Sequence, residues 1–365
     1  MQEDISKIPD SFVKSRIMRY PSPLIFSFVE SRGIPHPEDI EKEELVDILL
    51  EEHRDVAYDL YNAAEIKKYL SEDLLLERVA DLPDISGGDA TREELVLSLI
   101  KNEETDVLHD VELLMSQERA KTYRRYILTG SELQFDPSAL LDRESSAFED
   151  LRNSIEMRLT LPGKMATLER VLQREESFLF FIKYVDKIKY AEEMEGRHWD
   201  TLVRRVIAVL HPPSDSLEIG TPDPNRERRA LYTLSSFLTG RDDSFAPWDI
   251  STSAIVRSIT DPDWESNAGA SGTVGISYAD FVNLDLQGRP QKMSLLGDDV
   301  ILTIRALTQE GLDLSRIGTL HKIRFVFKNR KIDLFPEDGK FIFLAYMDER
   351  QRREFYEWIS AMDWA

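Results

Sequence analysis

Five basic residues lie close together near the C-terminal end of the chain and are candidates for binding an anion. Within ten residues the chain places these bases with no acidic residue between them: Lys322, Arg324, Lys328, Arg330 and Lys331. Guanidinium and ammonium groups bind phosphates, nucleic acid and acidic protein surfaces. The alternative interpretation is a solvated strand face whose charges protect an exposed sheet edge.

A metal-dependent phosphodiesterase is the enzymatic alternative for this part of the chain. It would use Asp333, Glu337 or Asp338, and Lys340, because two-metal cleavage needs clustered carboxylates and a lysine that orients water. The interval between Asp333 and Asp338 is short for carboxylates on separate strands. The pair Asp338-Gly339 is also explained as a hairpin turn. A metal-dependent hydrolase or nuclease therefore stays a remote alternative.

Other patterns that carry chemistry are incomplete. The glycine–lysine pair at 163–164 is followed by Met165, where a phosphate-binding loop has a hydroxyl residue. His109 stands near Asp110 and Glu112, but a solvated acidic helix face explains these three residues as well as a metal site does. The chain has no cysteine, which excludes disulfides, thiolate metal sites and a thiol nucleophile. The sequence thus predicts no catalytic residue, cofactor or metal.

Charge is distributed unevenly along the 365 residues. The formal net charge is −22, from 46 basic and 68 acidic residues, and residues 1–120 hold 29 of the acids but only 13 of the bases. A field of this sign repels phosphate backbones. We therefore expect the N-terminal third to bind nucleic acid poorly and to suit a basic partner.

An internal repeat occupies this acidic third. The segments Pro21–Glu52 and Leu70–Glu103 are related by an offset of 50 residues, and the string EELV recurs at 43–46 and at 93–96. Each copy predicts a helix, an extended loop and a second helix. In the second copy the second helix is expected to begin at Thr91, because a glutamate follows three residues later, as in a capping box.

The first copy resembles a known module. Gly33-Ile34, Lys42 and Leu45-Val46 have the spacing of SAP-type helix–extended-loop–helix modules, and more closely that of the modules at the N-terminus of transcription terminator Rho. The resemblance implies nucleic-acid binding through basic residues. Here the second helix carries Glu43 and Asp47 among other acids, which favours a scaffold or protein-docking unit instead.

The middle of the chain is expected to be helical. Amphipathic patterns predict helices at about 145–160, 164–193, 196–211, 225–239 and 249–259. The second of these is long enough for the spine of a helical bundle. Its apolar centre, Phe178–Val185, is expected to be core, and it is too short to span a bilayer.

After residue 272 the pattern alternates as in strands, and a helix closes the chain. The expected strands are Val274–Leu284, Val300–Leu307, His321–Lys328, Lys331–Phe335 and Phe341–Ala345. The final string, DERQRREFYEWI, predicts an amphipathic helix capped by Asp348. This ending resembles the tail of a pleckstrin-homology-like domain. The resemblance implies that Trp358 is a core residue and that the domain binds phosphoinositides or proteins.

The sequence as a whole predicts a multidomain α+β protein. Its mostly helical N-terminal two-thirds would be followed by a small antiparallel sheet or barrel capped by a helix. The expected domains are two acidic helix–loop–helix modules at 1–118, a helical middle at 119–262 and a β-rich domain at 263–365.

The expected function is that of a non-enzymatic adaptor or scaffold. Its partner would be a protein, and the alternative is nucleic acid or another polyanion bound at the basic hairpin and at 119–125. The N-terminal residues do not resemble a secretory signal, and no apolar run is long enough for a membrane span, so a cytoplasmic protein is expected.

Overall fold

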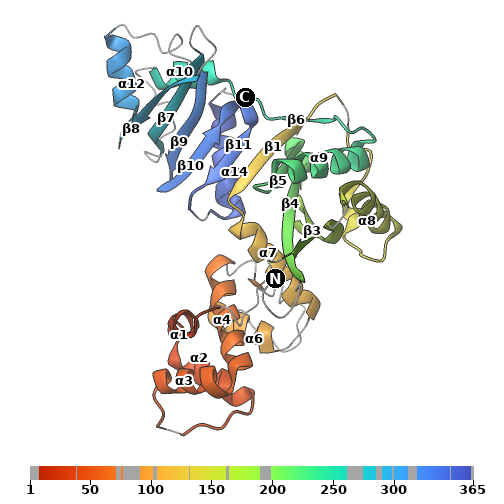
Figure 1. Cartoon of the computed structure of the whole chain (residues 1–365), viewed down its shortest axis with the longest axis vertical. Coiled ribbons are helices and arrows are strands. Elements are labelled where there is room, and N and C mark those ends of the chain that lie inside the picture. Colours follow the sequence, from red (N-terminus) through yellow and green to blue (C-terminus); the bar gives the residue numbers. More distant parts are fainter. Residues whose placement is uncertain are drawn as a thin grey trace. The chain divides into compact units, whose positions relative to one another are not determined.

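The structure is a computed structural model of the whole chain. It describes residues 8–37, 39–70, 75–76, 91–101, 105–130, 132–161, 164–189, 199–260, 274–284, 290–297, 300–310, 319–345 and 347–362. The chain divides into two compact units, Met1–Arg119 (unit 1) and Ala120–Ala365 (unit 2). Figure 1 shows unit 1 in red to orange and unit 2 in yellow to blue.

Unit 1 is built from helices. They are α1 (Asp10–Ile17), α2 (Ser22–Ser31), α3 (Lys42–Glu52), α4 (Arg54–Tyr69), α6 (Arg92–Lys101) and α7 (Thr105–Arg119). Helix α4 is in contact with α1, α3, α6 and α7, and it buries leucine, isoleucine, alanine and tyrosine side chains. Burial of this apolar stripe is the main force that holds such short helices together.

The first repeat has the expected form, with α2 and α3 joined by a segment without regular structure. In the second repeat α6 follows the predicted capping box: the Thr91 amide donates to Glu94 Oε2 at 2.7 Å, and the Glu94 amide donates to Thr91 Oγ1 at 3.3 Å. Most of the first helix expected in that copy lies outside the described residues. The Lys42 ammonium donates to the carbonyls of Met18 and Tyr20 at 2.7 and 2.5 Å, so it holds the chain after α1.

Unit 2 contains an antiparallel sheet of 11 strands. They are β1 (Thr122–Leu128), β2 (Lys164–Arg174), β3 (Ser177–Lys189), β4 (Trp199–His211), β5 (Ser216–Gly220), β6 (Phe245–Pro247), β7 (Val274–Leu284), β8 (Pro290–Leu296), β9 (Thr319–Phe327), β10 (Arg330–Phe335) and β11 (Lys340–Phe343). Their order is β2-β3-β4-β5-β1-β11-β10-β9-β7-β8, and β6 pairs with β1. Strand β1 thus joins a first half, β2 to β5, to a second half, β7 to β11.

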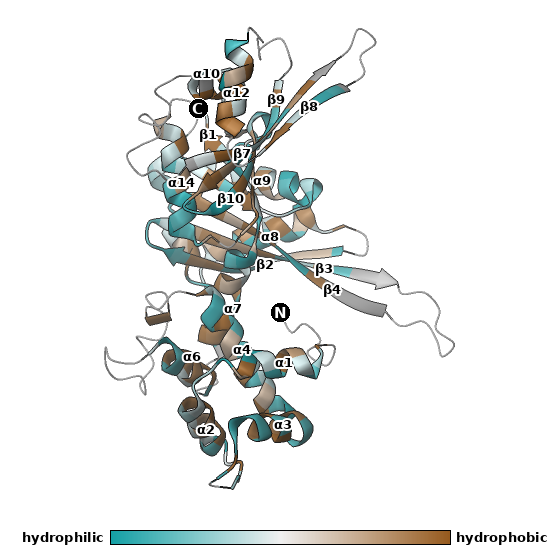
Figure 2. Ribbon diagram, turned by 90° about the vertical axis from the view of Figure 1, so that its left-hand side faces the viewer, coloured by the Kyte–Doolittle hydropathy of each residue, from teal (hydrophilic) through white to brown (hydrophobic). Residues whose placement is uncertain are grey.

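Each half of the sheet has its own core and its own helices. Helices α8 (Ser146–Leu159) and α9 (Pro224–Thr239) share a buried cluster with β2 to β5. Helices α10 (Thr252–Thr260), α12 (Val300–Gln309) and α14 (Glu349–Ala361) share another with β7 and β9 to β11. In Figure 2 brown, hydrophobic residues run along the strands of unit 2. Short 3-10 turns, η2 (Pro137–Leu140), η3 (Pro212–Ser214) and η4 (Pro336–Asp338), connect elements.

The predicted fold class is wrong. The mostly helical middle and the small C-terminal sheet are replaced by one large sheet, because 164–193 contains the hairpin β2–β3 and 196–211 contains β4. Phe180 packs in the cluster under α8 and α9, while its neighbours Leu179 and Phe181 are fully buried as well. A strand buried on both faces has no alternating pattern, and periodicity alone does not separate it from a buried helix. The chain turns between β2 and β3 at Glu175, whose φ is +50°, and no glycine or proline stands there to predict the turn.

One strand expected in the last third is also wrong. Val300–Leu307 lies in helix α12, where Val300, Ile301 and Ile304 form the buried face. The other four expected strands are present as β7, β9, β10 and β11, and the helices near 145–160, 225–239 and 249–259 are present as α8, α9 and α10.

The closing helix is confirmed in detail. Asp348 caps α14, because its Oδ1 accepts from the Gln351 amide at 2.8 Å. The Trp358 ring lies 5.5 Å from the Phe325 ring and 6.2 Å from the Phe327 ring, both on β9, so Trp358 is partly buried and packs against the aromatic core.

Candidate ligand pocket

The predicted basic hairpin is β9–β10, and three of its five bases are in ion pairs within the chain. Asp333 accepts from Lys322 at 2.7 Å and from Arg324 at 2.5 and 3.0 Å, and Lys328 pairs with Glu354 of α14. Among the described residues, Arg330 and Lys331 make no ion pair. The hairpin is therefore largely occupied by its own counter-ions, and its role in partner binding stays a prediction.

The residues considered for a nuclease site are arranged differently from what metal chemistry needs. Asp333 is buried between two bases, and Asp338-Gly339 forms the tight connection between β10 and β11, with Gly339 at φ +56°. The described residues contain no group of three or more histidine or acidic side chains that is suited to hold a metal ion. This covers His109, Asp110 and Glu112 as well.

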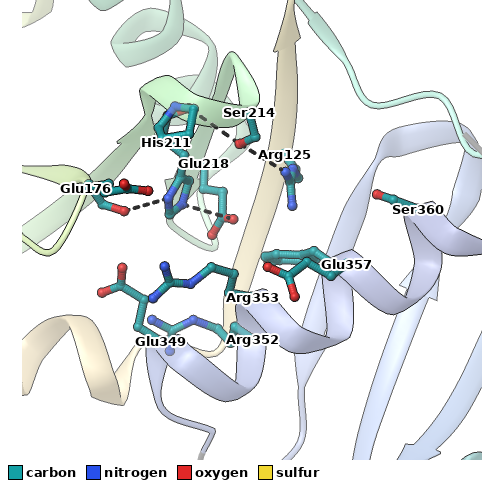
Figure 3. A pocket seen from close by; sticks show the side chains of 13 residues that line it. Arg125, Glu176, His211, Ser214, Glu218, Glu349, Arg352, Arg353, Glu357 and Ser360 are labelled. Carbon is teal, nitrogen blue, oxygen red and sulfur yellow. Dashed lines mark hydrogen bonds and ion pairs between the residues drawn. The ribbon is translucent and has the colours of Figure 1, made fainter.

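A cavity of about 380 Å³ lies in unit 2, between the first half of the sheet and helix α14. Figure 3 shows its polar lining. The lining residues come from β1, the β2–β3 turn, the end of β4 with η3, β5, and α14: Arg125, Glu176, Ser177, His211, Pro213, Ser214, Glu218, Glu349, Arg352, Arg353, Tyr356, Glu357 and Ser360. Its size is within the range of small-molecule sites.

The helical spacing of α14 and the alternation of β1 place these side chains at the cavity. Helix α14 carries an apolar stripe toward the core, and next to it a polar stripe at helical spacing, from Glu349 through Arg352 and Tyr356 to Ser360. Strand β1 alternates, so Tyr123 and Arg125 share one face while Tyr126 packs in the cluster under α8 and α9. The Arg352 guanidinium lies 5.0 Å from the Tyr123 ring centre.

Arg125 is the most distinctive residue of the pocket. Its guanidinium contacts two aromatic rings that meet edge to face, and it lies 4.8 Å from the Trp248 ring centre and 4.7 Å from that of Tyr356. Only 9% of the residue is exposed. Its one side-chain hydrogen bond to a described residue is a long one, 3.5 Å from Nη2 to Ser214 Oγ, and its Nε is buried without a partner. A buried guanidinium with so few acceptors is costly unless another group binds it.

A polar chain, Ser177–His211–Glu218, lines the wall beside Arg125. Ser177 Oγ lies 2.7 Å from His211 Nδ1, and His211 Nε2 lies 3.4 Å from Glu218 Oε1. An ionised carboxylate only accepts hydrogen bonds, so the network places a proton on Nε2 and lets Nδ1 accept from the serine hydroxyl. Figure 3 shows both contacts as dashed lines.

Electrostatics within the pocket favour an ionised Glu218. Burial raises the pKa of Glu218, but the hydrogen bond from His211 and the electrostatic effect of His211, Arg125 and Arg352 outweigh burial, and the net pKa lies below the ordinary glutamate value. Burial, with the nearby charge of Glu218, raises the pKa of the Tyr356 hydroxyl well above its usual value. Tyr356 therefore stays protonated and serves as an aromatic surface for Arg125.

The rim of the pocket differs in charge from its floor. Glu349 accepts from Arg174 at 3.1 Å, and Arg353 pairs with Glu175. Glu176 and Glu357 are exposed and make no ion pair with a described residue. The mouth thus presents carboxylates above a floor that holds a guanidinium.

Sequence reasoning did not find this pocket. Its residues are spread from position 125 to position 360, so no local motif joins them. Arg125 was considered only as part of a basic segment facing nucleic acid. The one available signal was the polar stripe of α14, which lies next to the apolar stripe that predicts the helix.

The comparisons with known proteins add no family. No protein-family model matches the chain, and no curated protein sequence matches it either. No helix among the described residues has the length and apolar character needed to cross a membrane.

Proposed function

We propose that the chain is a non-enzymatic binding protein whose unit 2 takes an oxyanion, a carboxylate or a phosphate, into the pocket at Arg125. The observation that carries this proposal is the guanidinium of Arg125, nine-tenths buried, facing the cavity, and hydrogen-bonded to a described side chain only by the long contact with Ser214. Charge-assisted hydrogen bonds from arginine to such groups are among the strongest in proteins.

The surroundings of Arg125 support binding of an anion. The Trp248 and Tyr356 rings both contact the guanidinium and restrict its side chain before a ligand binds, which lowers the entropy cost of binding. The hydroxyl group of Ser214 lies in the same lining and can donate to an oxyanion.

Titration calorimetry of the full chain with methyl phosphate and with acetate tests the proposal. We expect saturable binding by the wild type and binding that is at least tenfold weaker for Arg125→Gln, since a hydrogen bond to a charged group contributes about 1.5–3 kcal/mol. Arg125→Lys keeps the charge without the planar fork and should fall between the two.

Arg228→Gln is the matched control, because it removes an exposed arginine of the same unit that lies outside both the pocket lining and the basic hairpin. It should bind both anions like the wild type. Failure of the wild type to bind either anion, or equal affinity of folded Arg125→Lys and wild type for both, would contradict the proposal.

A second candidate, a serine hydrolase, is favoured by the Ser177–His211–Glu218 chain. Serine, histidine and a carboxylate occur in the order of a catalytic triad. Three features argue for a structural role instead: the ring nitrogens are exchanged relative to the usual triad, the contact to Glu218 is 3.4 Å long, and Ser177 is 1% exposed.

Labelling with a fluorophosphonate probe separates the two candidates. A binding protein should leave Ser177 unmodified, and mass spectrometry of the treated chain should find no adduct. An adduct at Ser177 that is lost in His211→Ala would establish the hydrolase and overturn the non-enzymatic proposal.

The wider role inferred from the sequence is compatible with this pocket. An adaptor or scaffold with a protein partner, acting in the cytoplasm, stays a prediction. The acidic surface of unit 1 supports a basic partner, because residues 1–120 carry most of the net negative charge.

A further inference from the structure

We infer that the ligand of the pocket is dipolar: it carries an oxyanion for Arg125 and, a few bonds away, an ammonium or guanidinium group for the carboxylates at the mouth. This inference rests on the proposed function and specifies its ligand class. It follows from the opposite charges that the floor and the rim of one cavity present.

The rim supplies two carboxylates that form no ion pair with a described residue, although the charge of Glu357 also acts on the Arg353 guanidinium. Glu176 lies in the β2–β3 turn and Glu357 lies on α14, both exposed and both in the lining. Figure 3 shows them reaching the pocket from these two separate elements. By contrast, Glu349 and Glu175 are already paired with Arg174 and Arg353.

An independent observation on the floor of the pocket points to a ligand. Arg125 reaches the cavity from the central strand β1, and its Nε is buried without a partner. A simple anion would satisfy Arg125 but would enter past two unpaired carboxylates, which repel it. A ligand with a cationic group at its outer end removes this repulsion and pairs with the rim.

Four small probes of matched size test the inference by titration calorimetry of the full chain. Phosphoethanolamine is compared with ethyl phosphate, and β-alanine with propionate, so that each pair differs by one ammonium group. We expect the amine to tighten binding by about two- to fivefold per carboxylate, the range of exposed ion pairs. The two pairs also show whether phosphate or carboxylate is the better anion.

The variant Glu176→Gln with Glu357→Gln should remove the preference for the amine while it leaves ethyl phosphate binding unchanged or tighter. Glu337→Gln, which removes an exposed carboxylate of the same unit outside the lining, is the control and should keep the preference. Equal or weaker binding of the amine by the wild type, or a preference that survives in the double variant, overturns the inference. Absence of binding by all four probes would overturn the proposed function itself.

Discussion

The substitution Asp333→Asn tests how the bases of the β9–β10 hairpin are used. Asp333 is 3% exposed and accepts hydrogen bonds from Arg324 at 2.5 and 3.0 Å and an ion pair from Lys322 at 2.7 Å. The asparagine has nearly the same shape but no charge. It therefore leaves two cations side by side without the carboxylate that separates them.

The size of the effect follows from burial. Removal of one partner of a buried ion pair costs about 3–5 kcal/mol, because the remaining charge stays desolvated. The side chains of Lys322 and Arg324 keep 20% and 25% of their exposure, so water partly solvates the charges left behind. We expect the free energy of unfolding to fall by about 3 kcal/mol in Asp333→Asn and by roughly 1–2 kcal/mol in Arg324→Gln.

Urea unfolding at neutral pH, followed by circular dichroism, measures these differences. Arg330→Gln is the control and should lie within about 0.5 kcal/mol of the wild type. The double variant of Asp333→Asn and Arg324→Gln should be less destabilised than the sum of its parts, since it removes one of the unpaired cations. A loss below about 1 kcal/mol in Asp333→Asn would refute the view that the hairpin bases are structural.

Three further predictions concern the backbone, pH and a helix cap. Gly339→Ala should lower the free energy of unfolding in urea by at least about 2 kcal/mol, because φ is +56° and the added Cβ would lie 2.7 Å from the Trp248 carbonyl oxygen. Gly130→Ala is the control, since Gly130 has φ +65° but open space around it, and it should lower that free energy by only about 1 kcal/mol. Glu218→Gln should lower the free energy of unfolding at pH 7 and make that free energy less sensitive to acid. The pKa of Glu218 is lowered in the folded state, so its charge stabilises the fold above the unfolded pKa of about 4.3, and this contribution disappears as the pH falls through the folded pKa. Urea unfolding at pH 7 and at pH 3 measures the difference. Equal acid sensitivity of variant and wild type would contradict that account. Thr91→Ala should destabilise unit 1 by about 1 kcal/mol through loss of the capping box, and an unchanged melting curve would show that the cap is not needed.

The sequence predicted those parts of the fold whose signals are local. The capping box at Thr91, the cap at Asp348, the core position of Trp358 and the turn at Gly339 are each set by a few neighbouring residues. The same holds for the amphipathic helices α8, α9 and α10, each of which has one buried side.

The sheet in the middle of the chain was missed because its strands are buried on both faces. Phe178–Val185 reads as apolar all round in either a helix or a central strand, and its length when joined to its neighbours favoured the helix. This segment is a strand because β3 pairs with β2 and β4 in the sheet, and no neighbouring residue in the sequence indicates that pairing.

The pocket was missed for a related reason. Arg125, His211 and Tyr356 meet only because β1 lies next to β5 in the sheet and α14 closes the chain beside them. Conversely, three of the five hairpin bases looked free in the sequence because their counter-ions, Asp333 and Glu354, lie across a strand pair and on a distant helix.

A crystal structure of the full chain grown with selenate, an anomalously scattering oxyanion, tests the central claim most directly. The account predicts an anomalous peak in the cavity, with selenate oxygens within hydrogen-bond distance of the Arg125 guanidinium, and its loss in Arg125→Gln. An empty cavity in wild-type crystals, with the Arg125 guanidinium bonded instead to a carboxylate of the chain, would contradict it.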